Sequence, residues 1–124
     1  MNQERVNDRA KLMMHRVFAR RLRDDPRLVE RARAVLDRLI LDGRGMDCYR
    51  EWQAVLGQAP ERVAELLVRR SERMDRLRLS SPFPLVTEIA ITDPDIRRRI
   101  WRLAKRGLAL RSESGDRPPV PHAP

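Results

Sequence analysis

Apolar residues recur at the spacing of one helical face over most of this chain. They fall three or four positions apart over residues 6–22, and the same spacing returns over residues 28–40. Arginines fill many of the positions between them, so each segment is expected to form an amphipathic helix with a basic outer face. The segments meet at Asp25-Pro26, where aspartate suits a helix cap and proline suits a first turn. We predict two long antiparallel helices joined there.

Shorter helices are predicted in the middle of the chain. Residues 47–56 carry Tyr49 and Trp52 on one side, and Gly57 ends that segment. Pro60 begins the next helix, which has apolar residues facing inward and acids in its first turn. Ser71 either caps a fifth helix or lies inside a continuation that ends near residue 79, and the sequence leaves both alternatives open.

The C-terminal third begins with an ambiguous stretch. Residues 85–91 alternate as in a strand but also fit a helical turn, and a lone strand has no partner, so we expect helix or extended loop. Asp93-Pro94 repeats the helix-start signal, and Gly107 is expected to end the last helix. Its predicted inward face consists of Ile96, Ile100, Leu103 and Ala104.

Length and composition predict an all-α protein of one domain. The 124 residues leave little room for a second core, and scarce aromatic residues favour packed helices over a sheet. We expect a compact bundle of about five or six helices over residues 1–110. Residues 111–124 are polar and proline-rich and predict a disordered tail. A single cysteine, no signal peptide and no apolar run of ~20 residues predict a cytoplasmic protein without membrane contact.

The sequence contains no recognisable catalytic constellation. Its two histidines, His15 and His122, have no second ligand at metal-binding spacing, and His15 is expected to be exposed or at the rim. Cys48 has no base in a recognisable context, and no glycine-rich phosphate loop is present. We therefore predict a protein that is not an enzyme, with no catalytic, metal-ligating or cofactor-binding residue.

The net charge of +9 points to binding instead. All but two of the 27 basic residues are arginine, which favours an anionic partner but is also what a GC-rich genome produces. The densest cluster is expected to meet an acidic protein or a nucleic acid. It consists of Arg97, Arg98, Arg99, Arg102, Lys105 and Arg106. Trp101 is predicted to be core or an interface anchor. The loop residues Ser81, Pro82 and Phe83 are predicted to contact a partner protein, although Phe83 is also a core candidate.

Three parts of the chain resemble a known class of proteins. They are residues 14–16 (MHR) together with residues 19–26 (ARRLRDDP), residues 51–56 (EWQAVL), and residues 80–83 (SSPF) together with residues 98–102 (RRIWR). These segments resemble small bacterial antitoxins of type II toxin–antitoxin systems, whose partner is a nucleotidyltransferase-type toxin. The resemblance covers about residues 8–106, and the chain departs from it over residues 84–92.

This resemblance implies a non-enzymatic protein that neutralises a cognate toxin by occluding its active site. The loop with Phe83 and the arginines would then pack on the toxin and meet its acidic residues. The alternative is a small basic regulator that binds DNA or RNA. The two interpretations are compatible, because antitoxins also bind their own operators. The oligomeric state is not indicated by the sequence.

Overall fold

The protein is all-α over the residues that the computed structural model describes, 3–43 and 47–116, with side chains described as far as Gly107. This confirms the predicted fold class and the predicted number of helices. The α-helices are α1 (Gln3–Asp24), α2 (Leu28–Leu41), α3 (Asp47–Leu56), α4 (Pro60–Leu67), α5 (Glu72–Arg78) and α6 (Pro94–Asp116), with a short 3-10 helix, η1 (Phe83–Leu85). Within these ranges, no helix combines the length and apolar character that a bilayer span requires.

Several helices begin at the residues that the sequence marks as caps. The Ser71 hydroxyl accepts a hydrogen bond from the Met74 amide at 3.1 Å, so Ser71 caps a separate fifth helix. At the start of α6, the Asp93 carboxylate accepts from the amide of Asp95 at 2.9 Å. Because these groups satisfy backbone donors that the helix leaves unpaired, they fix where each helix begins.

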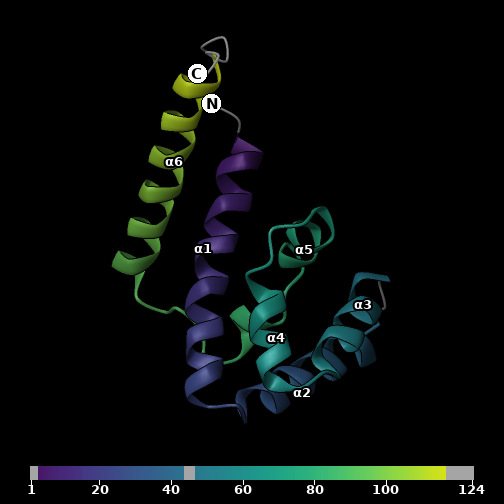
Figure 1. Ribbon diagram of the computed structural model, residues 1–124. Coiled ribbons are helices and arrows are strands. Elements are labelled where there is room, and N and C mark those ends of the chain that lie inside the picture. The colour runs from purple at the N-terminus through teal and green to yellow at the C-terminus, as the bar shows by residue number, and fades with distance from the viewer. Residues whose placement is uncertain (1–2, 44–46, 117–124) are drawn as a thin grey trace.

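The predicted antiparallel pairing of the first two helices is wrong. In Figure 1, α1 runs beside α6 and packs on α4, whereas α2 crosses below and packs on α3. Asp25 accepts a hydrogen bond from the Arg27 amide at 3.2 Å, and the regular helix begins only at Leu28. The chain therefore turns a corner at Pro26 and carries α2 away from α1, whose apolar surface is covered by helices from later in the sequence.

A cluster of aromatic side chains lies at the centre of the core. Phe83 stacks on Phe18 with ring centroids 6.1 Å apart and meets the edge of Trp52 at the same distance. The indole nitrogen of Trp52 donates to the carbonyl of Leu77 at 2.9 Å. The cluster thus ties α1, α3, α5 and η1 together, and aromatic pairs of this geometry stabilise beyond the area they bury.

The segment between η1 and α6 has no regular secondary structure, in agreement with the loop alternative. Two arginines fasten it to the helices on either side. Arg21 of α1 donates to the carbonyls of Ile89 and Ala90 at 2.5 and 3.0 Å, and Arg97 of α6 donates to that of Ile91 at 2.9 Å. These bonds satisfy backbone acceptors that a strand or helix would otherwise pair.

The last helix is longer than the sequence suggests. The backbone of α6 remains helical through Gly107 to Asp116, so the prediction that Gly107 ends it is wrong. A lone glycine costs a helix only about 1 kcal/mol relative to alanine. At Gly107 an added Cβ would lie 2.8 Å from Nε of Arg9, so the small residue leaves room for that arginine. Of the predicted tail, residues 111–116 continue the helix, and residues 117–124 lie outside the described residues.

Candidate functional site

The loop that the sequence offered as a partner contact belongs to the core. Phe83 is completely buried, Pro82 is buried and Ser81 is half-buried. Of the two alternatives for Phe83, partner contact or core, the structure shows the core, because a side chain without exposed surface cannot contact a partner. The physical reason is the aromatic cluster: Phe83 fills the space between Phe18 and Trp52, and withdrawing it would leave a cavity.

His15 is also buried, which contradicts the prediction of an exposed or rim residue. Its Nδ1 lies 2.7 Å from the Lys11 carbonyl, and its Nε2 lies 2.8 Å from the Ser81 hydroxyl. The ring also contacts the edge of Phe18 at a centroid distance of 4.9 Å. Burial lowers the pKa of His15 to about 3, with the positive charges of Arg78 and Lys11 adding to the effect. The imidazole is neutral at physiological pH.

The His15–Ser81 pair has the spacing of a base and a nucleophile, but its bonds serve the fold. With Nδ1 donating to Lys11, Nε2 is the acceptor for the Ser81 hydroxyl hydrogen. The same hydroxyl oxygen accepts from the Phe83 amide at 3.2 Å. Both functions of the hydroxyl are thus used to hold the loop on α1. A side chain with no exposed surface has no access to a substrate, so we assign the pair a structural role.

A buried arginine, Arg78, was not anticipated from the sequence. Its side chain is 1% exposed, and it donates to the carbonyls of Leu67 and Arg69 and pairs with Asp75. Burial lowers the pKa of Arg78, an effect that the carboxylate of Asp75 opposes. These contacts join the end of α4 to α5. Nothing in the sequence distinguishes this arginine from its many neighbours, so pattern analysis could not find it.

The predicted basic cluster lies on the outer surface of α6. All six residues are exposed, but two of them have partners within the protein. Arg97 is the residue that fastens the Ile91 carbonyl, and Arg98 pairs with Asp95 three positions earlier. The other four form no ion pair among the described residues. They are Arg99, Arg102, Lys105 and Arg106.

The inward face of α6 is narrower than predicted. Ile100 and Ala104 are buried, but Ile96 and Leu103 are 44% and 41% exposed, so their assignment to the core is wrong. The cause is that α6 packs mainly against one neighbour, α1, and one neighbour covers only a thin stripe of a helix. Trp101 is half-buried against the core, on the opposite flank from Ile96 and Leu103 at 100° per residue.

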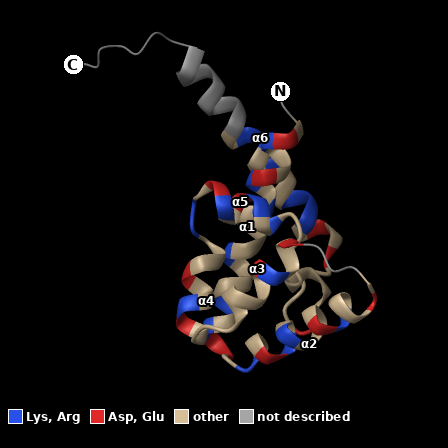
Figure 2. Cartoon of the chain, turned by 90° about the vertical axis from the view of Figure 1, so that its right-hand side faces the viewer, with Lys and Arg blue, Asp and Glu red and all other residues tan. Residues whose placement is uncertain are grey.

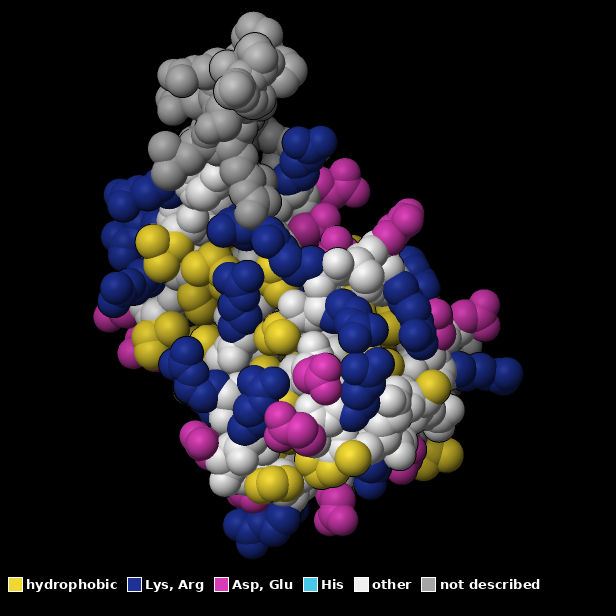
Figure 3. Space-filling model, in the orientation of Figure 1, with side chains coloured by type: hydrophobic (Ala, Val, Ile, Leu, Met, Phe, Trp, Pro, Cys, Tyr) yellow, Lys and Arg dark blue, Asp and Glu magenta, His cyan; other side chains and the backbone are white. Residues whose placement is uncertain are grey.

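The exposed flank of α6 continues onto α1. The two helices are antiparallel neighbours in Figure 1, and Gly107 lies against the side chain of Arg9. One and three turns further along that side of α1 come the half-buried Met13 and the exposed Arg20. We call this surface the α1–α6 face and define it by Met13, Arg20, Ile96, Arg99, Leu103 and Arg106. Figure 3 shows hydrophobic side chains among basic ones over these two helices.

Several basic residues on the other helices pair with acids. Figure 2 shows blue and red segments interleaved on α2 and α4. Glu51 of α3, for example, pairs with Arg73 and with Arg76 of α5, and the hydrogen bonds from Arg76 lower the pKa of Glu51. On the α1–α6 face, Arg20, Arg99 and Arg106 form no such ion pair among the described residues, and the apolar side chains of Ile96 and Leu103 are exposed beside them.

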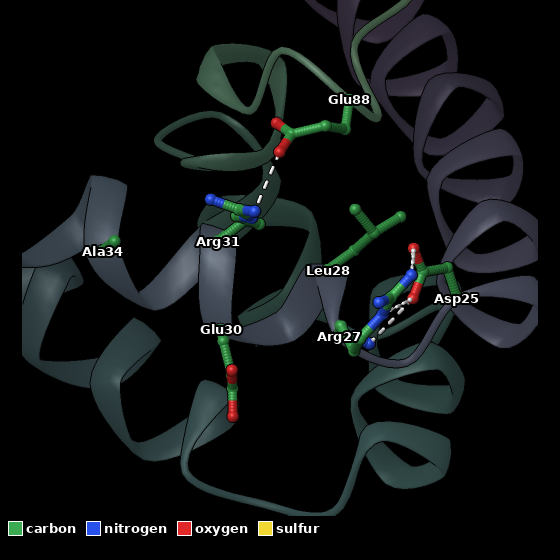
Figure 4. A pocket seen from close by; sticks show the side chains of 7 residues that line it. All are labelled: Asp25, Arg27, Leu28, Glu30, Arg31, Ala34 and Glu88. Atoms are coloured by element: carbon green, nitrogen blue, oxygen red, sulfur yellow. Dashed lines mark hydrogen bonds and ion pairs between the residues drawn. The ribbon is translucent and has the colours of Figure 1, made fainter.

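A hollow of about 450 Å³ lies between α2 and the loop before α6. Figure 4 shows its two ion pairs, Arg31 with Glu88 at 3.1 Å and Arg27 with Asp25 at 3.0 Å. Leu28, Glu30 and Ala34 complete the lining. None of the predicted site residues lines this hollow, and its arginines are already neutralised from within the protein.

No protein-family model, curated protein or solved structure matches this chain.

Proposed function

We propose that this protein is a non-enzymatic, antitoxin-like protein of the bacterial cytoplasm that binds a toxin through the α1–α6 face. The observation that carries the proposal is the composition of this face: Ile96 and Leu103 are half-exposed beside arginines that form no ion pair among the described residues. Protein interfaces combine an apolar centre with arginine in this way. Isolated exposed apolar residues would carry no such argument.

Binding of this face at the active site of the toxin would neutralise the toxin. The resemblance implies a nucleotidyltransferase-type toxin, an enzyme whose active site needs carboxylates to hold metal and nucleotide. Arginines such as Arg99 and Arg106 suit this surface, because a guanidinium forms two parallel bonds to one carboxylate. The apolar residues of the face would exclude water around these pairs. Occupation of the cleft, without any chemical step by this protein, would then stop the toxin.

Co-expression tests the proposal. The adjacent gene is expressed alone, with this protein, and with a double variant of the face, Ile96→Ser with Arg99→Glu. We expect arrest of growth by the adjacent gene alone, rescue by the wild type and loss of rescue by the variant. Leu41→Ser with Arg38→Glu is the matched control, because both residues are exposed on α2 away from the face. An adjacent gene that is harmless alone, or whose toxicity is unaffected by this protein, contradicts the proposal.

A nucleic acid is the second candidate partner, and one observation favours it. Arg98, Arg102, Lys105 and Arg106 project from one side of α6 at helical spacing, as a row that can follow a phosphate backbone. Binding of this kind weakens steeply as salt rises. Changing Arg102 and Arg106 to alanine should reduce both the affinity for a DNA or RNA duplex and its salt dependence. Absence of binding at low salt would eliminate this candidate.

A further inference from the structure

The apolar part of the α1–α6 face forms a strip with a defined length. Ile96 and Leu103 are seven positions apart, which places them two turns, or roughly 10 Å, apart on the same flank of α6. Met13 of α1 lies beside this flank, partly buried against the core. The strip therefore offers apolar contact along two helical turns and runs along α6 beside its contact with α1.

Both edges of the strip are basic. Arg20 borders it on the α1 side, and Arg99 and Arg106 border it on the outer side of α6. All three are exposed and form no ion pair among the described residues. Asp95, the acid in the first turn of α6, is already paired with Arg98. A ligand that covers the strip would thus meet positive charge along both of its long edges, from α1 on one side and from α6 on the other.

We infer that the segment of the partner that docks here is an amphipathic helix with an apolar stripe bordered by acidic residues on both sides. This inference rests on the proposed function, because it describes how the toxin would be held. Apolar residues at positions i, i+3 or i+4, and i+7 of such a helix match a two-turn strip, and glutamates beside them reach both rows of arginine. Charge complementarity thereby selects this helix over an apolar one.

Two other occupants fit less well. A nucleic-acid backbone would pair with the arginines but gain nothing from Ile96 and Leu103, and it has the outer row of α6 available instead. A second copy of this chain would bring its own basic face against this one, and like charges across an interface cost several kcal/mol. An acidic amphipathic helix uses both components of the face.

The test uses a labelled synthetic helix with leucines at i, i+4 and i+7 and glutamates on both sides, bound to the full-length protein and followed by fluorescence anisotropy. We expect saturable binding that weakens by about tenfold or more when Ile96→Ser or Arg99→Glu is introduced. The control variants Leu41→Ser and Arg38→Glu should bind within about twofold of wild type, because surface residues outside a contact contribute little. Circular dichroism verifies that each variant is folded.

Matched peptides decide what the face recognises. A peptide with lysines in place of the glutamates, and one with serines in place of the leucines, should each bind about tenfold more weakly or worse. Equal binding of either peptide, or no binding of the acidic one, overturns the inference. Displacement of the acidic peptide by a DNA duplex through the same residues also overturns it. Rescue of toxin-expressing cells without peptide binding would refute only this inference, whereas peptide binding without rescue would refute the proposed function.

Discussion

Acid should destabilise this protein through His15. Burial holds the pKa of His15 at about 3 in the folded state, whereas an unfolded chain has the ordinary value of 6.5. Between these two values the unfolded state binds more protons, so the stability contributed by neutral His15 is present above pH 6.5 and is lost as pH falls. A pKa difference of one corresponds to about 1.4 kcal/mol. The free energy of unfolding should therefore drop by about 2 kcal/mol between pH 7 and pH 5.

The matched variant is His15→Gln, which does not titrate but keeps a side-chain acceptor for the Ser81 hydroxyl. Urea unfolding is followed by circular dichroism at several pH values from 5 to 8 for both proteins. The wild type should lose about 2 kcal/mol more than the variant over this range. Contributions from other groups, such as Asp8, whose pKa is raised by burial and by nearby acids, cancel in the difference. Parallel pH profiles for the two proteins would refute the reasoning.

Two further substitutions test individual hydrogen bonds. Trp52→Phe removes the donor to the Leu77 carbonyl and leaves a gap in the aromatic cluster. The free energy of unfolding, measured by denaturant titration, should therefore fall by about 2–3 kcal/mol. A change near zero would contradict the burial of this pair. Ser71→Ala removes the cap of α5 and should cost about 1 kcal/mol in the same titration, whereas Ser71→Thr, which retains a hydroxyl, should cost clearly less.

Local chemistry accounts for what the sequence predicted well. Asp93-Pro94, Pro60 and Ser71 each mark a helix start through bonds or restrictions confined to one turn, and all three helices begin where these residues place them. The helical periodicity of apolar residues likewise identified the buried side of α3, including Tyr49 and Trp52. Such features need no knowledge of which helices become neighbours.

Apart from the predicted helix end at Gly107, which was a local signal, the errors concern tertiary neighbours. Whether Ile96 and Leu103 are buried depends on how many helices surround α6, and periodicity cannot supply that number. His15 is polar and was placed at the rim, but its partner, Ser81, lies 66 positions away in sequence. Sequential adjacency suggested that α1 pairs with α2, whereas the preferred partners of α1 come later in the chain. The arginine cluster is exposed, which is the ordinary outcome for like charges, and its role as a binding surface stays a prediction.

The attachment of α6 along a single stripe also bears on how this protein can evolve. Few of its side chains between Pro94 and Gly107, the part of α6 whose side chains are described, take part in the core, with Ile100 and Ala104 as the buried examples. Substitutions at exposed positions of α6 that have no partner within the protein, such as Arg99 and Arg102, should therefore leave the free energy of folding almost unchanged. The exposed surface of α6 can therefore change residue by residue while the body of the protein stays the same and the protein stays folded at each step.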